Sequence, residues 1–113
     1  MNIDPAIRNT LDQARTSLNT IGTTLPAGVT PLLTQFNTDF DLIIATPKGS
    51  SHADADKLIK NLRTNTDAVA AMTPADKTAI KAKIDSLEEA NNEYFNHLAY
   101  EARRIHILNA NKK

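Results

Sequence analysis

The chain has 113 residues, and 13 Lys and Arg balance 13 Asp and Glu, so its formal net charge is zero. This length suits one domain of ordinary size. The zero balance excludes a strongly basic nucleic-acid-binding protein, or an acidic tail protein, as a description of the whole chain. Because the chain contains no cysteine, disulfides, thiolate metal sites and thiol nucleophiles are excluded as well.

The first predicted helix covers residues 5–21. Asp4 is a favoured N-cap, and Pro5 follows at the first helical position. Gly22 stands where a C-terminal cap is expected. Apolar residues recur between them at spacings of about three and four, which places them on one helix face; they are Ile7, Leu11, Ala14, Leu18 and Ile21.

The second and third helices are predicted over residues 31–45 and 52–71. Thr30 and Pro31 repeat the start signal of the first helix, and Pro47 ends the second. Ser51 and Asp54 have the spacing of a capping box at the start of the third. Thr66 interrupts the apolar face of the third helix, so it either lies at the boundary of that face or bonds back to its own backbone.

The fourth helix is predicted over residues 74–109, after Thr73 as its N-cap. At 1.5 Å per residue it would be about 54 Å long, roughly twice the length of the others. It either overhangs the bundle or folds back at Asn91 and Asn92. We expect the overhang, because the apolar seam keeps its phase through both asparagines. The seam consists of Ile80, Ile84, Leu87, Asn91, Tyr94, Leu98, Ala102, Ile105 and Leu108.

These elements predict an all-α fold: an antiparallel four-helix bundle over residues 1–113, with a long C-terminal helix overhanging the bundle. The expected core is aliphatic, with few aromatic residues. Its leading members are Ile7, Leu11, Leu18, Leu33, Phe36, Phe40, Leu58, Leu62, Val69, Ile80, Ile84 and Leu87.

The back of the long helix is the candidate interaction surface. On a helical wheel, Tyr100 and Ile107 lie about 180–200° from the core seam, so the late part of the helix has a second apolar face. Tyr and Arg are also frequent hot-spot residues at interfaces. The alternative is that two single apolar side chains are simply exposed, which is common. The candidate partner-binding residues are Glu93, His97, Tyr100, Arg103, Arg104 and Ile107.

Charges on this helix are sorted into basic, acidic and basic blocks. If two copies of the helix pair antiparallel with their centre near Asn96, Glu88 faces Arg104 and Glu89 faces Arg103. Such pairs would favour this register of a homo-oligomer. The alternative is that the acidic block pairs within the chain, with basic residues of the third helix: Lys57, Lys60 and Arg63.

No motif for catalysis, a cofactor or a metal is present. A stripe of Glu89, Glu93, His97 and Glu101 has only one histidine, and the Glu-x-x-His motif of di-metal bundles is missing. No phosphate-binding glycine loop occurs, and the three scattered histidines give no ground for a serine triad. We therefore expect no enzyme.

The sequence thus predicts a non-catalytic protein–protein interaction module. The absence of a targeting signal and of a long apolar run predicts a soluble protein of the cytoplasm, without a membrane span. The alternative function is nucleic-acid binding by a basic C-terminal end, although basic residues also suit a helix C-terminus because of its dipole. That end contains Arg103, Arg104, His106, Lys112 and Lys113.

Overall fold

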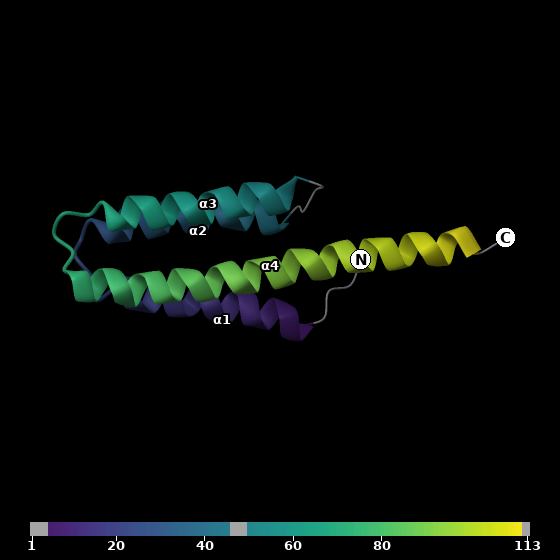
Figure 1. The fold of residues 1–113 in the computed structure, drawn as a ribbon, viewed down its shortest axis with the longest axis horizontal. Helices are drawn as coiled ribbons and strands as arrows, with labels where there is room; N and C mark the ends of the chain where they lie inside the picture. The colour runs from purple at the N-terminus through teal and green to yellow at the C-terminus, as the bar shows by residue number, and fades with distance from the viewer. Residues whose placement is uncertain (1–4, 46–49, 112–113) are drawn as a thin grey trace.

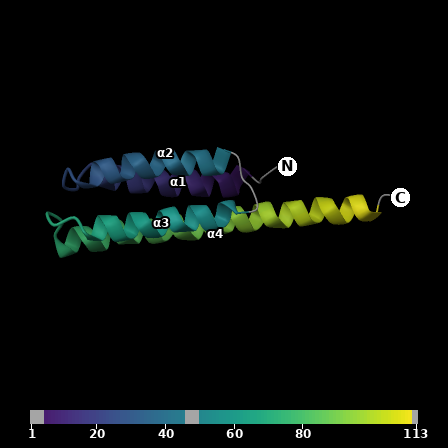
Figure 2. The ribbon, with the colours of Figure 1, turned by 90° about the horizontal axis from the view of Figure 1, so that it is seen from above.

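The computed structural model describes residues 5–45 and 50–111, and they form an all-α bundle of four helices (Figure 1). Consecutive helices run antiparallel, and their order places α4 beside both α1 and α3 (Figures 1 and 2). The closest pairs are α1 with α4 and α2 with α3; of the four pairs of helices that touch, α1 and α2 touch least. This architecture confirms the predicted fold class. The helices are α1 (Pro5–Gly22), α2 (Val29–Ala45), α3 (Ser51–Asp67) and α4 (Pro74–Asn111).

The start of α4 follows the sequence signal, whereas the starts of α2 and α3 do not. The N–H of Asp76 donates to Oγ1 of Thr73 at 3.1 Å, which confirms Thr73 as N-cap. Helix α2 begins at Val29, before the predicted Thr30 cap, because Val29 is fully buried and its N–H already donates to the Pro26 carbonyl. The predicted N-cap Asp4 and the proline predicted to end the second helix, Pro47, lie outside the described residues.

The predicted capping box of α3 is wrong. Ser51 is the first residue of the helix and is buried, so Ser50 occupies the cap position and makes no side-chain hydrogen bond there. The predicted end at residue 71 is also wrong, because α3 ends at Asp67 and two turns follow. The helical spacing of apolar residues continues to Val69 and Met72 because both side chains pack against the core. They do so from the turns that follow α3.

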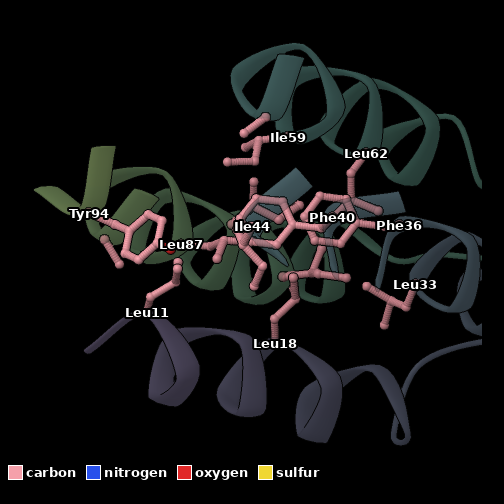
Figure 3. Packing of buried hydrophobic residues seen from close by; sticks show 14 of the residues in the cluster. Leu11, Leu18, Leu33, Phe36, Phe40, Ile44, Ile59, Leu62, Leu87 and Tyr94 are labelled. Carbon is pink, nitrogen blue, oxygen red and sulfur yellow. The ribbon is translucent and has the colours of Figure 1, made fainter. Parts of the chain in front are cut away.

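One apolar core joins all four helices (Figure 3). The predicted core is confirmed, with Ile7, Leu58 and Val69 at its partly buried edge. Phe36 and Phe40 stack with ring centroids 5.2 Å apart. The buried hydrophobic residues are Leu11, Leu18, Val29, Leu33, Phe36, Phe40, Ile44, Ala55, Ile59, Leu62, Met72, Ile80, Ile84, Leu87, Ala90, Tyr94, Phe95 and Leu98.

Two polar side chains are buried in this core without hydrogen bonds. Asn91 is 0% exposed, and neither its amide nitrogen nor its amide oxygen has a partner. Thr66 is 1% exposed, and its hydroxyl has no partner either. Both alternatives predicted for Thr66 are therefore wrong: it lies inside the core, and it does not bond back to its helix. Unpartnered buried polar groups lower stability.

The contact between α1 and α2 is partly polar. Arg15 on α1 makes an ion pair of 2.6 Å with Asp41 on α2, and its guanidinium lies 5.3 Å from the centroid of the Phe40 ring. Next to it, Asn37 donates to Asn19 at 2.7 Å. These directional bonds fix the register of two helices that share little apolar surface.

Helix α4 is continuous through Asn91 and Asn92, which confirms the predicted overhang. It has 38 residues, against 17 or 18 in each of the others. Among its described side chains, Leu98 is the last one in the core cluster. Beyond that point the helix extends past the other three (Figures 1 and 2), and the longest dimension of the molecule is 63 Å. We call residues 99–111 the projecting segment.

Gly22 is required by packing and not by backbone conformation, since its φ is not positive. A Cβ at Gly22 would overlap Cδ1 of the buried Leu33, whereas one at Gly28 would meet Val69 Cγ1 at an ordinary 3.5 Å. We expect Gly22→Ala to destabilise the protein by about 1–3 kcal/mol through overpacking, and Gly28→Ala to change stability little. Urea unfolding followed by circular dichroism measures both; equal stabilities of the two variants would contradict this packing.

Asn91→Leu is expected to raise stability by about 1–2 kcal/mol, because it replaces an unpartnered buried amide by an apolar group of similar shape. The melting temperature should rise by roughly 5 °C. Differential scanning calorimetry measures this shift. A lower melting temperature for the variant would show that the amide of Asn91 is satisfied in the folded protein.

Candidate interaction surface

The base of the projecting segment is fixed by contacts from the first residues of α1 and α3. Nε2 of His52 on α3 lies 2.8 Å from Oδ1 of Asn92, and the His52 ring lies 5.7 Å from that of Phe95. From α1, the guanidinium of Arg8 lies 5.9 Å from the centroid of the Tyr94 ring. Helix α4 is thus held on two sides just before it leaves the bundle.

Phe95 is a buried residue beside the base of the projecting segment, and the sequence analysis did not single it out. It lies off the apolar seam, yet it is 6% exposed and packs edge-on against Tyr94 at 5.1 Å. Phe95 is buried because the start of α3 lies beside it. The sequence would have indicated this only if the start of α3 had been placed next to residue 95 of α4.

The predicted partner-binding residues fall into three groups: exposed, partly buried and not described. Glu93, Tyr100 and Arg103 are exposed, Tyr100 by 60%. His97 is partly buried; its Nε2 lies 3.9 Å from Oε1 of Glu101, and its ring lies 6.4 Å from that of Tyr100. The side chains of Arg104 and Ile107 lie outside the described residues, although the helix backbone there is described.

The acidic block of α4 is partly paired within the chain. Arg63 of α3 makes ion pairs with Asp85 at 2.6 Å and with Glu88 at 2.7 Å. Lys60 instead pairs with Asp56 of its own helix, and the hydrogen bond and charge of that carboxylate raise the pKa of Lys60. The pairing predicted as an alternative to self-association is therefore confirmed for Arg63, and Glu88 is not free to meet a cation from elsewhere.

A shallow groove runs between α1 and α4, on the side away from α2 and α3. One hollow of this groove has a volume of about 300 Å³. Small side chains form much of its surface: Ala14 and Ser17 from α1, and Ser86 and Ala90 from α4. Three charged residues of α4 also line it: Lys83, Glu89 and Glu93. Among the described residues, neither of these two glutamates has an ion-pair partner.

Leu42 on α2 is the other large exposed apolar residue of the described chain, with 67% of its surface exposed. It belongs to a helix that does not pack against α4. A single exposed leucine is ordinary for a protein surface, so Leu42 serves below as a matched control for Tyr100.

The acidic stripe of α4 that the sequence suggested for a metal is not gathered into a site. Among the side chains that the structure describes, no three His, Asp or Glu lie close enough together to hold a metal ion. His52, at the start of α3, is engaged by Asn92 of α4. Within residues 5–45 and 50–111, no helix combines the length and the apolar character needed to cross a membrane.

Comparison with known proteins adds no assignment to these observations. No protein-family model, no curated protein and no solved structure matches the chain.

The structure predicts opposite roles for two neighbouring aromatic residues. Phe95→Ala should destabilise the bundle by about 3 kcal/mol, because it removes a buried ring between α3 and α4. Tyr100→Ala should change stability by no more than about 0.5 kcal/mol, as expected for a surface residue. Thermal unfolding at low protein concentration measures both. A large loss of stability on Tyr100→Ala would show that this ring packs against its own chain.

Proposed function

We propose that this protein is a non-catalytic interaction module, and that the projecting segment of α4 binds a partner protein or a second copy of the chain. The observation that carries the proposal is the exit of α4 from the bundle after Leu98. The helix then continues to Asn111, with Tyr100 60% exposed near its base. A tyrosine on a protruding helix supplies a large contact area at low entropic cost.

The energetics of the projecting segment support this proposal. A helical extension of about 13 residues without tertiary packing is only weakly stable in water, even where the folded part of the helix nucleates it. The segment contains Ile105, Ile107 and Leu108 in its sequence. A partner helix or groove would bury such residues and stabilise the helical conformation, as in amphipathic helices that dock into grooves.

The proposal keeps the cytoplasm as the location, since a chain without disulfides needs no oxidising compartment. Nucleic-acid binding by the basic end stays the alternative function. Arg103 is exposed as that alternative requires. Binding to nucleic acid should weaken steeply as the salt concentration rises, whereas an interface that depends largely on burial of Tyr100 should weaken less steeply.

Tyr100→Glu is expected to weaken association at least tenfold, because it places a charge in the apolar centre of the interface. Leu42→Glu should leave association unchanged, since it alters an equally exposed residue on another helix. Sedimentation velocity gives self-association, and a pull-down from the native host gives heterologous partners. The proposal fails if both variants behave as the wild type in both measurements. Salt-dependent gel shifts of a duplex by the wild-type protein would favour the alternative.

A further inference from the structure

We infer that the groove between α1 and α4 is the receiving half of a self-association site, in which the projecting segment of a second copy lies antiparallel against α4. This inference rests on the proposed function and names its partner. Because each copy has both a projecting segment and a groove, the contact would form twice around a two-fold axis.

The shape of the groove suits a helix. Its surface carries Ala14 and Ser17 on one side and Ser86 and Ala90 on the other, around a hollow of about 300 Å³. Helix axes approach to about 8–10 Å, depending on the size of the side chains at the contact. Small residues on both sides of the groove therefore allow a third helix to lie close to α1 and α4.

The charges of the groove and of the projecting segment are complementary, which favours this segment as the helix that binds in the groove. Lys83 also lines the groove, but Glu89 and Glu93 outnumber it and give the groove a net negative charge. Arg103 on the projecting segment is exposed and has no acidic partner among the described residues. With two α4 helices antiparallel and centred near Asn96, Arg103 of the second copy lies opposite Glu89. The same complementarity steers the segment toward the groove and sets its direction.

The same register covers the exposed ring of Tyr100. In this pairing Tyr100 lies level with Asn92 of the second copy, one turn from Glu89. The pair between Glu88 and Arg104 that the sequence predicts plays no part, since Arg63 of the same chain already holds Glu88. The register therefore depends on Tyr100 and on the pair between Glu89 and Arg103.

The absence of cysteine permits a direct test of the register. Asn96 is exposed on α4 and would face its own counterpart across the two-fold axis. Asn96→Cys should form a covalent dimer under mild oxidation, at a protein concentration of about 100 μM. Lys57→Cys, exposed on α3 away from the groove, is the matched control and should stay monomeric on a non-reducing gel.

Charge reversal tests the occupant of the groove. Glu89→Arg and Arg103→Glu should each weaken the dimer roughly tenfold, because each replaces two attractions per dimer by two repulsions. The double variant should recover the affinity of the wild type. Sedimentation equilibrium measures all four proteins, and circular dichroism checks that each retains its helices.

Two outcomes would overturn the inference in distinguishable ways. If the wild type is monomeric at about 100 μM and Asn96→Cys gives no covalent dimer, a second copy is not the partner. If Tyr100→Glu abolishes a dimer that Glu89→Arg leaves intact, the projecting segment binds, as proposed above, but to another surface than this groove.

Discussion

The packing of α4 against α1 and α3 is the constraint on which the rest of the structure depends. Helices α1 and α3 both begin at the same end of the bundle, and each has fewer than half the residues of α4. Only the first part of α4 can therefore be buried. Contacts of Arg8 and His52 with α4 mark where this burial ends, and Leu98 is the last of the described α4 side chains in the core cluster. The length difference alone carries α4 past the other three helices.

Most of the fold follows from the sequence, because helix periodicity and core burial are local consequences of residue spacing. The overhang was predictable as well, since the apolar seam keeps its phase through Asn91. The end of α3 was not, because Val69 and Met72 keep a helical spacing while packing from a turn. The cap of α3 was predicted one residue too late, because the helix already includes Ser51 and Ser50 takes the cap position. Propensity is a weak signal wherever tertiary packing opposes it.

The candidate site was predictable only in part. Exposure of Tyr100 follows from the helical wheel, but which charges remain unpaired depends on the neighbouring helix. Arg63 takes Asp85 and Glu88 and leaves Glu89, a division that no spacing along one helix reveals. The groove likewise needs two helices, since Ser17 and Ser86 are distant in sequence and line one hollow only after α1 packs on α4. The sequence shows which side chains share a helix face. Which of those side chains are already paired within the chain is known only once the helices are packed.

The central claim is that the projecting segment is helical because it acts as one half of a contact. Hydrogen exchange of the backbone amides, read by mass spectrometry at low and at high protein concentration, tests this claim most directly. The account predicts that amides within α4 up to Leu98 are protected at both concentrations. It also predicts that amides of residues 99–111 exchange quickly when dilute and become protected when concentrated, or when a partner is added. Equally fast exchange of residues 99–111 under all of these conditions would contradict the account.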